Sequence, residues 1–453
     1  MRRLITLFAL ICYFFSLSGY ANLPPQTRLL VLTDIHFDPF VACYKNNAQP
    51  CPLIQKLQAA EAKEWPRILA AEGVEKPAYR QDTNYTLLVS ALHAAALAAT
   101  TQKADYVLVL GDFLAHDFRH YYKRYSKDKS RSGYQRFVNK TFTFLTDEIA
   151  DAFPALNVYM LVGNNDSYGN DYSSVPKGQF FHDMAQEWSG VIKNKTNQTA
   201  FQHQFTAGGY YAVNLNASMR LIMLNTVLFS NKVRGSAITQ AANDELNWLH
   251  NELMAAKENN QHVILGMHIP EGIDVYSSLH IKLFTLVEFW QAAFAERFDA
   301  ELQQFSAQIT GIFAGHLHAD WFQIRRFDNF HEIPILGTPA ISPIFGNNPG
   351  FKIYSYDDHA AINDFVTYYY PLTNDDGWKE EYRFNHTYQP KCKTCAITQG
   401  IKALKPTGLL ADVYRHFYSV STNSQPITTQ WYPYYWCVIH EHDAAHYRSC
   451  IAC

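Results

Sequence analysis

Five short apolar runs in this 453-residue chain each end in side chains that are able to bind a metal. The run over residues 309–314 is followed by Gly315, His316, Leu317 and His318. Residues two apart on an extended strand point the same way, so both imidazoles can face one site. Imidazole is a common ligand of zinc and of other borderline metals. Alone, the two histidines could equally be polar residues of a loop, and ligands at other strand ends decide between these interpretations.

The other four runs predict strands that deliver further ligands to the same place. Residues 28–33 and 105–110 are two such strands, and the apolar periodicity over 82–102 predicts a helix between them. A strand–helix–strand unit makes the sheet locally parallel, and polar groups at the ends of parallel strands share one crevice. The runs over 158–162 and 262–267 end in the same way. The candidate ligands are Asp34, His36, Asp112, Asn164, His268, His316 and His318.

This set predicts a site for two divalent metal ions. Two neighbouring cations repel each other, and a bridging carboxylate, for which Asp112 is the candidate, offsets that repulsion. Neutral imidazoles and an amide oxygen complete the ligand sets without excess negative charge, which keeps the metals Lewis-acidic. A water shared by such metals is largely deprotonated near neutral pH and can attack a phosphorus atom bound across them.

The remaining pattern predicts one large α/β domain with an appended C-terminal segment. Residues 39–80 contain several prolines and a cysteine pair, which favours an irregular insertion over the mouth of the site. Further elements are predicted as helices over 134–150, 238–259 and most of 276–308, a hairpin of 209–216 with 220–226, and strands near 321–326, 333–336 and 352–356.

The N-terminus predicts export from the cytoplasm. Two arginines precede an apolar stretch over residues 4–17, and Gly19 and Ala21 fit a cleavage site after Ala21, so residues 1–21 are interpreted as a signal peptide. The stretch is short for a membrane span and no other long apolar run follows, which predicts no transmembrane anchor. The expected location is secreted or periplasmic, or the lumen of a lysosome- or vacuole-like compartment in a eukaryote.

Cysteine usage agrees with export. Cys43 and Cys51 lie close together and predict a local disulfide, and five more cysteines fall between Cys392 and Cys453. In an oxidising compartment these favour disulfides over a zinc site.

The formal net charge of −3 argues against a general nucleic-acid binder. The basic stretch over 119–136 is either solvated surface or a basic apron beside a phosphate-handling site.

The order of these motifs resembles that of the calcineurin-like metallophosphoesterases. His116, four residues after Asp112, and the sequence His268-Ile269-Pro270-Glu271-Gly272 make the chain similar to the acid sphingomyelinase-like phosphodiesterase branch. The resemblance covers residues 28–385, leaves 386–453 as a cysteine-containing extension, and implies a four-layer α/β/β/α sandwich. The matching segments are Asp34-Ile35-His36, Gly111-Asp112, Gly163-Asn164-Asn165-Asp166, Gly266-Met267-His268 and Gly315-His316-Leu317-His318.

The resemblance also implies which residues bind each of the two metals. The metal is usually zinc in this branch, with iron or manganese as alternatives. The first set is Asp34, His36, Asp112 and His318, and the second set is Asp112, Asn164, His268 and His316.

Two further residues are expected to act on the substrate. His116 is the candidate general acid, and the alternative is a residue that only orients a metal ligand. Asn165 stands where superfamily members carry a histidine that binds phosphoryl oxygens, and its amide can donate a hydrogen bond without a charge. The resulting Gly-Asn-Asn-Asp sequence resembles that of vacuolar endopolyphosphatases.

The predicted function is a secreted phosphodiesterase that hydrolyses small-molecule or lipid phosphoesters by in-line attack of a metal-bridging hydroxide. A polyphosphatase or nucleotide phosphohydrolase on the same site is the alternative, favoured by Asn165 and the basic stretch. A non-catalytic binding protein is disfavoured because every expected ligand is present.

Overall fold

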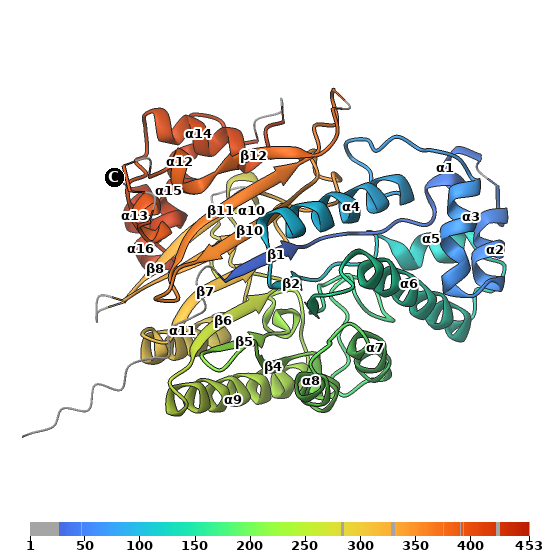
Figure 1. The fold of residues 1–453 in the computed structure, drawn as a ribbon, viewed down its shortest axis with the longest axis horizontal. Helices are drawn as coiled ribbons and strands as arrows, with labels where there is room; N and C mark the ends of the chain where they lie inside the picture. Colours follow the sequence, from blue (N-terminus) through green and yellow to red (C-terminus); the bar gives the residue numbers. More distant parts are fainter. Residues whose placement is uncertain are drawn as a thin grey trace, which may run out of the picture.

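Two six-stranded sheets form the centre of the protein (Figure 1). This computed structural model describes residues 27–46, 48–281, 285–327, 331–374, 376–389, 391–392, 394–422 and 426–452. The predicted signal peptide and Cys453 lie outside the described residues.

The first sheet contains the strands predicted nearest the N-terminus. Strands β1, β2 and β3 pair in parallel through helices α4 (Tyr85–Gln102) and α6 (Arg131–Ala152), as the strand–helix–strand pattern predicts. These three strands are apolar and buried along most of their length, because both faces of the sheet are covered. In sheet order the strands are β12 (Lys379–Arg383), β11 (Ile362–Tyr369), β10 (Gly350–Tyr356), β1 (Arg28–Leu32), β2 (Tyr106–Val109) and β3 (Asn157–Met160).

The second sheet begins with the predicted hairpin. Its strand order is β4 (Tyr211–Asn214), β5 (Met219–Met223), β6 (His262–Met267), β7 (Ile309–Ala314), β9 (Glu332–Gly337) and β8 (Trp321–Arg326). Strands β5, β6, β7 and β9 are parallel, whereas β4 and β8 pair antiparallel at the two edges.

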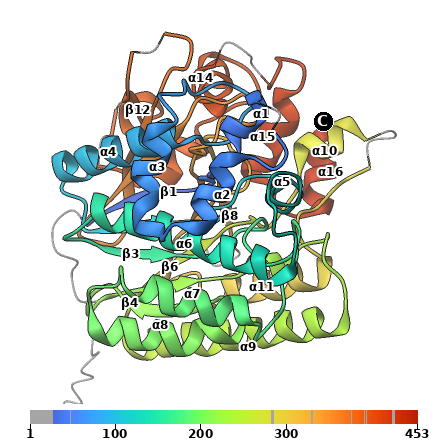
Figure 2. The ribbon, with the colours of Figure 1, turned by 90° about the vertical axis from the view of Figure 1, so that its right-hand side faces the viewer.

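The two sheets face each other, and helices cover their outer faces. Phe313 of β7 meets Tyr354 of β10 edge to face, with ring centroids 4.7 Å apart, in the apolar layer between the sheets. Helix α4 packs on β1 and β10, and α9 (Ser236–Glu258) packs on β5 and β6. Figure 2 shows α9 beside α8 (Lys195–Gly208) and α7 (Gln179–Ser189) below the second sheet. This is the four-layer α/β/β/α arrangement that the resemblance to the metallophosphoesterases implies.

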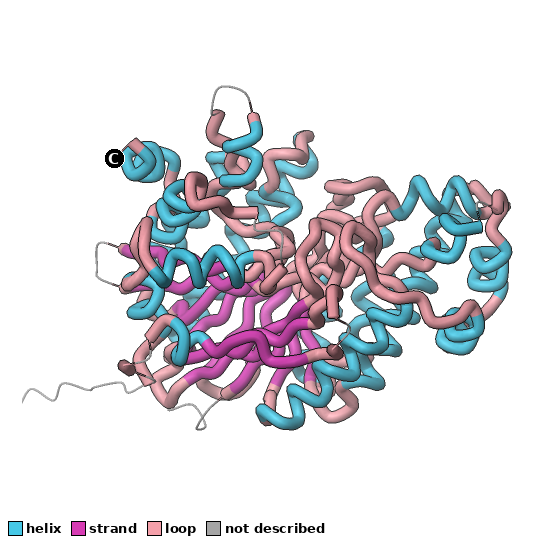
Figure 3. The backbone as a smooth tube through the Cα atoms, turned by 90° about the horizontal axis from the view of Figure 1, so that it is seen from above, coloured by secondary structure: helices cyan, strands magenta, loops and turns pink. Residues whose placement is uncertain are grey.

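The carboxyl ends of strands from both sheets meet at one place. The carbonyl of Leu110, just after β2, lies 2.7 Å from Nδ1 of His268, just after β6. Seen from above, the strands end against a dense group of loops near the middle of the molecule (Figure 3). Strand ends of both sheets therefore contribute to a common loop region.

The prediction for residues 39–80 is wrong in two respects. Most of the segment as far as Ala71 is helical, with α1 (Val41–Asn46), α2 (Pro52–Ala59) and α3 (Trp65–Ala71) and a short 3-10 turn between α2 and α3, whereas residues 73–80 are irregular as predicted. Pro52 and Pro66 lie in the first turns of α2 and α3, where a missing backbone N–H costs nothing. The three helices pack beside α5 (Phe118–Tyr125) and α6 at the right-hand edge of Figure 1, away from the loop region.

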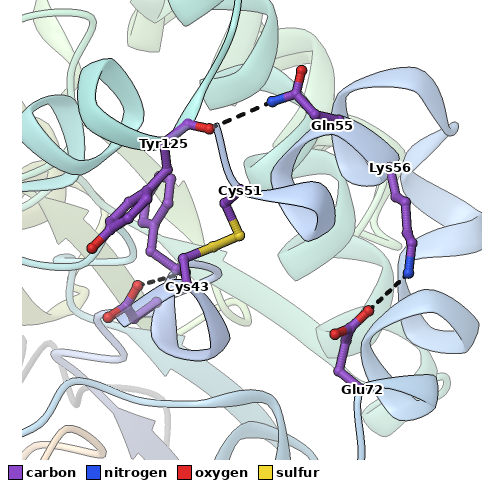
Figure 4. The surroundings of a disulfide bond; sticks show 8 residues. Cys43, Cys51, Gln55, Lys56, Glu72 and Tyr125 are labelled. Carbon is purple, nitrogen blue, oxygen red and sulfur yellow. Dashed lines mark hydrogen bonds and ion pairs between the residues drawn. A yellow bond between two sulfur atoms is a disulfide. The ribbon is translucent and has the colours of Figure 1, made fainter. Parts of the chain in front are cut away.

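The local disulfide predicted in this segment is confirmed. Cys43 and Cys51 are bonded (Figure 4), and the backbone amide of Cys51 donates to the carbonyl of Tyr125, 2.8 Å away. The bridge therefore fixes α1 and α2 against the end of α5.

The structure adds detail to one predicted helical region and two strands to the first sheet. Residues 276–308 are predicted to be mostly helical, and α10 (Val275–His280) and α11 (Ala292–Phe305) lie there. Glu288, which lies between these helices, forms a bridge with Ile273. Strands β11 and β12 were not predicted.

The C-terminal segment is helical and carries two more disulfides, Cys392–Cys395 and Cys437–Cys450. Its apolar residues, such as Tyr414 and Ile439, belong to the same buried cluster as β1 and β10. Among the described residues, the segment after the expected boundary at residue 386 therefore shares the hydrophobic core of the preceding domain and does not form a separate one. The helices are α12 (Phe384–Thr387), α13 (Ile397–Lys402), α14 (Leu409–Tyr418), α15 (Tyr432–His440) and α16 (Ala444–Ile451). Within the described ranges, no helix combines the length and hydropathy needed to cross a bilayer.

Candidate metal centre

Five of the predicted metal ligands have a backbone conformation that L-residues rarely adopt. The φ angles are +50° for Asp34, +44° for His36, +55° for Asp112, +71° for His316 and +53° for His318. Such left-handed residues cluster at functional sites, because they persist only where the surrounding structure enforces them. Here each strand turns sharply at its end and directs the following side chain into the loop region.

The first group of donors comes from β1, β2 and β7. Nε2 of His36 lies 3.1 Å from Nε2 of His318 and 3.4 Å from Oδ2 of Asp112. Oδ1 of Asp34 lies 3.3 Å from Nε2 of His318 and 3.7 Å from Nε2 of His36. Two carboxylates and two imidazole nitrogens therefore converge on one point.

The second group shares Asp112 with the first. Oδ2 of Asp112 lies 3.2 Å from Nε2 of His268, and Oδ1 of Asn164 lies 3.1 Å from the same nitrogen. A ring nitrogen of His316 completes a group with Asp112 and His268 whose ligand atoms lie within 4.8 Å of one another. Oδ2 of Asp112 thus lies within 3.4 Å of an imidazole of each group, whereas Oδ1 of Asp34 lies 3.9 Å from Nε2 of His268.

Two of the histidines are oriented in the way that metal-binding histidines usually are. Nδ1 of His36 lies 2.9 Å from the carbonyl of Leu114, and Nδ1 of His268 bonds the carbonyl of Leu110. A carbonyl accepts a hydrogen bond, so it fixes the proton on Nδ1 and leaves the Nε2 lone pair facing the centre. The donor set therefore fits divalent cations that accept nitrogen and oxygen ligands.

Burial and charge set the ionisation of these groups. Burial by itself would lower the pKa of His36, but Asp112 and Asp34 raise that pKa to about 10. The pKa of His268 is raised in the same way, against burial, to about 9. Burial would raise the pKa of Asp34, yet His318 and His268 hold it well below its usual value. By contrast, burial and the neighbouring His268 lower the pKa of His316 to about 3. The buried carboxylates are ionised and attract positive charge.

Two glycines make room for this arrangement. A Cβ on Gly315 would lie 2.1 Å from Oγ1 of Thr33 and 2.8 Å from Oδ2 of Asp34. A Cβ on Gly163 would lie 2.1 Å from Oδ1 of Asp112. Any larger residue at either position would displace a carboxylate of the centre.

His116 lies at the edge of the centre and is held by a residue that the motif analysis did not single out. Its ring stacks on that of His36, with centroids 4.1 Å apart, and its side chain is 32% exposed. Nδ1 of His116 lies 3.1 Å from the carboxylate of Asp82, which also accepts from the hydroxyl of Ser342. Asp82 precedes His116 by 34 residues, so no local pattern in the sequence indicates the pair.

Asn165 contacts the carboxylate shared by the two groups. Its backbone N–H donates to Oδ1 of Asp112 and its side-chain amide donates to Oδ2, each over 2.8 Å. Asn165 is not among the described residues that line the cleft beside the centre. Its expected contact with phosphoryl oxygens remains a prediction, and this geometry favours a role in positioning Asp112.

An Asn165→Ala variant distinguishes these two roles. Because the side-chain bond to Asp112 is lost while the backbone bond stays, we expect metal affinity to fall by about 10- to 100-fold. Metal titration followed by a chromophoric chelator measures this change. A kcat that falls at saturating metal, with unchanged metal affinity, would contradict the positioning role and favour contact with the phosphoryl group.

A cleft of about 500 Å³ opens beside the centre. Asp112, His116, Asn164, His316 and His318 lie on its wall. The basic stretch over 119–136 does not reach this wall, and within the described residues Lys232 is the one lysine or arginine that lines the cleft. Of the two interpretations of this stretch, solvated surface is therefore the one that fits the structure, and the cleft carries one lysine from a different segment.

Comparison with known proteins agrees with the motifs. Residues 27–320 match the calcineurin-like phosphoesterase family. The chain is 24% identical over 417 residues to acid sphingomyelinase-like phosphodiesterase 3b of Mus musculus, covering 87% of this chain and 83% of that protein. It is 23% identical over 443 residues to the cyclic GMP-AMP phosphodiesterase SMPDL3A of Rattus norvegicus, covering 93% and 90%.

A solved dimetal phosphatase from Danio rerio aligns with a TM-score of 0.42 and 10% identity, over 79% of this chain and 99% of that one. The family match spans well over half of the chain and includes each strand end that carries a candidate ligand. The protein therefore belongs to the calcineurin-like phosphoesterase family and is a hydrolase of phosphoric esters.

Proposed function

We propose that the protein is a phosphodiesterase with a binuclear metal centre that acts outside the cytoplasm. The observation that carries this proposal is the position of Asp112, whose Oδ2 lies 3.4 Å from Nε2 of His36 and 3.2 Å from Nε2 of His268. One carboxylate oxygen next to two separate imidazole groups is what a pair of neighbouring cations requires.

The two donor groups divide between the metals. Asp34, His36, Asp112 and His318 would hold one ion, and Asp112, Asn164, His268 and His316 would hold the other. Divalent cations bound by these residues, with zinc favoured by the nitrogen-rich donor set, would supply Lewis acidity and an activated water for in-line attack on phosphorus.

His116 acts on the leaving group in this proposal. Asp82, buried and ionised, accepts from the backbone N–H of His116 and lies 3.1 Å from its Nδ1. Burial raises the pKa of Asp82, but the contacts with His116 and His36 lower it overall. An imidazole held this way keeps Nε2 free to donate a proton to a departing alkoxide.

A diester substrate is favoured over a monoester by the relatives and by the cleft. Both curated relatives described above carry the name phosphodiesterase. The cleft is lined by aromatic residues as well as by the metal-binding groups, so it offers a surface for an organic substituent on phosphorus. Lys232 on the same wall favours the second candidate, a nucleotide phosphohydrolase or polyphosphatase, because it would attract an additional phosphate.

Three disulfides support a location in an oxidising compartment. They accord with the predicted export of the chain.

Metal removal and return test the proposal. Chelator-treated protein should lose hydrolysis of bis-p-nitrophenyl phosphate and regain it with Zn²⁺, and the diester should be a better substrate than p-nitrophenyl phosphate. Without metal, His36 and His268 hold protons at pH 7 because their pKa values are raised to about 10 and about 9. Zn²⁺ must displace these two protons, and the water shared by the metals loses a third, so metal binding at pH 7 should release about three protons per chain and strengthen as pH rises.

Proton release is measured with a pH indicator in weakly buffered solution, and metal content by elemental analysis. Binding of a single ion per chain, with full activity, would contradict the binuclear proposal. A clear preference for the monoester would favour the second candidate function.

A further inference from the structure

The basic stretch over 119–136 lies away from the wall of the catalytic cleft, but two of its arginines line a second cavity. This cavity has a volume of about 300 Å³ and is lined by the first turns of α5, α6 and α7. Arg119 comes from α5 and Arg131 from α6, and Ser167 and Ser173 add hydroxyl-bearing residues to the wall. The cavity therefore combines two cationic groups with neutral polar ones.

Both guanidinium groups are accessible, and neither is neutralised by a carboxylate. Arg131 is exposed and Arg119 is half-buried. Nη1 of Arg119 donates to Oδ1 of Asn170 over 3.3 Å, and its Cζ lies 5.9 Å from the centroid of the Tyr134 ring. Within the described ranges of the chain, neither arginine forms an ion pair with an acidic residue. The planar fork of an arginine matches the oxygens of a phosphate group.

One acidic residue also lines the cavity, but backbone amides occupy its carboxylate. Oδ1 of Asp166 accepts from the N–H groups of Phe113 and Leu114 over 2.9 Å and 3.2 Å, and Oδ2 accepts from that of Gly163 over 2.9 Å. Asp166 is buried, so its oxygens are directed to these amides and away from solvent. The positive charge of the two arginines therefore prevails on the accessible surface of the cavity.

Helix α7 begins at the same cavity and adds to its positive potential. Gly178 is the N-cap, and it has no side chain to accept from the first N–H groups of the helix. Uncapped N–H groups and the helix dipole favour a negative charge at this end. The contribution of the helix is secondary to that of the two arginines, which carry full charges.

A single loop separates this cavity from the catalytic cleft. Asn164 and Asp171 of this loop line the cleft, whereas Ser167 and Ser173 line the second cavity. The N–H of Tyr172 donates to the carbonyl of Asn164 over 2.8 Å, which closes the loop on itself. The cavity and the cleft share this loop but no lining residue, so they are two distinct sites.

We propose that Arg119 and Arg131 form a binding site for a phosphate dianion that is separate from the metal centre. The dianion is either inorganic phosphate or the phosphate of an organic monoester, since a cavity of about 300 Å³ with Phe180 on its wall has room for an organic group. The site needs no metal ion, so this inference stands independently of the phosphodiesterase function proposed above.

Calorimetric titration with inorganic phosphate tests the site, on the metal-loaded protein and again after chelation. We expect one phosphate per chain to bind after chelation, because the arginines bind the anion directly. Arg119→Gln and Arg131→Gln should each weaken this binding by about 10- to 100-fold, as expected for loss of a charged hydrogen bond.

Lys123→Gln is the matched control. Lys123 lies one turn after Arg119 on α5, is exposed and lines neither the cavity nor the cleft. This variant removes the same charge from the same surface, and phosphate binding should stay within about 2-fold because solvent and salt screen a distant charge. All three variants should hydrolyse bis-p-nitrophenyl phosphate within about 2-fold of the unmodified protein, which shows that the fold and the metal centre are intact.

Absence of phosphate binding after chelation would overturn the proposal. Equal weakening by Lys123→Gln and the two arginine variants would also overturn it, because attraction would then be diffuse. Phenylphosphonate, a stable analogue of a phosphomonoester, identifies the ligand: tighter binding than phosphate assigns the site to organic monoesters, and weaker binding assigns it to free phosphate. An unmodified protein that hydrolyses no diester would contradict the proposed function and leave this binding test unaffected.

Discussion

An Asp112→Asn variant should lose most of its activity, with kcat for a phosphodiester reduced by at least about 1000-fold. Oδ2 of Asp112 makes the closest approach to imidazoles of both donor groups, at 3.4 Å from His36 and 3.2 Å from His268, whereas Oδ1 of Asp34 lies 3.9 Å from His268. An amide has no negative charge to offset the repulsion between two cations, so one metal should be lost. Metal-ion catalysis supplies several kcal/mol of transition-state stabilisation, and each 1.36 kcal/mol is tenfold in rate.

Asp171→Asn is the matched control for that prediction. Asp171 lines the same cleft and accepts from the side-chain amide of Asn164 over 2.7 Å, but belongs to neither donor group. Loss of the Asp171 charge should lower kcat by about 10-fold, as expected for a residue that orients a metal ligand. Elemental analysis should show about one metal fewer in Asp112→Asn and no change in Asp171→Asn. Retention of both metals and of most activity in Asp112→Asn would remove the basis for a bridged pair.

A His116→Ala variant should lose about 100- to 10,000-fold in kcat with a diester whose leaving group is an alkoxide. With p-nitrophenolate as the leaving group the loss should stay below about 10-fold, because this weakly basic anion departs without a proton. The imidazole lies at the cleft, stacks on His36 and is held by Asp82. Steady-state kinetics with two diesters that differ only in the leaving group measure the contrast.

Asp82→Asn provides the control for the orientation of His116. An amide at this position keeps a hydrogen bond but lacks the charge that stabilises a protonated imidazole, so a smaller loss with the same dependence on leaving group is expected. Equal losses of His116→Ala on both diesters would argue that His116 orients the metal ligand His36 and does not donate the proton.

The candidate metal ligands can be selected from the sequence because their signal is local. An apolar strand followed by a small residue and a ligand is recognisable within about ten residues, and its repetition indicates parallel strands that end together. The structure places all seven predicted ligands in two adjoining groups around Asp112. Their roles in metal binding remain proposals that the experiments above test.

The pair His316 and His318 shows where the local argument stops. On an extended strand the two side chains would point the same way. Their φ angles of +71° and +53° break the extended conformation, so His318 lies against His36 and Asp34 while His316 groups with Asp112 and His268. The resemblance to the family implied this division, whereas the residue spacing alone did not.

Residues 39–80 illustrate a misleading local signal. Prolines suggested an irregular loop, but Pro52 and Pro66 occupy the first turns of helices, the one part of a helix that tolerates them. Composition shows only that a proline is present. The effect of the proline depends on where it lies in a helix, and the packing of that helix against its neighbours decides this position.

The sequence by itself determined which apolar strands end in candidate ligands, the order of these motifs along the chain, the family resemblance they carry and the local disulfide. Each motif, like the disulfide, depends on residues close together in the chain. Only the tertiary structure decided that Asp82 holds His116, that Asn165 bonds the shared carboxylate, and that Tyr418 and Tyr435 line the cleft. Each of these contacts joins residues that are dozens to hundreds of positions apart. Their side chains meet because two sheets and the C-terminal helices share one buried core, and no local spacing encodes that packing.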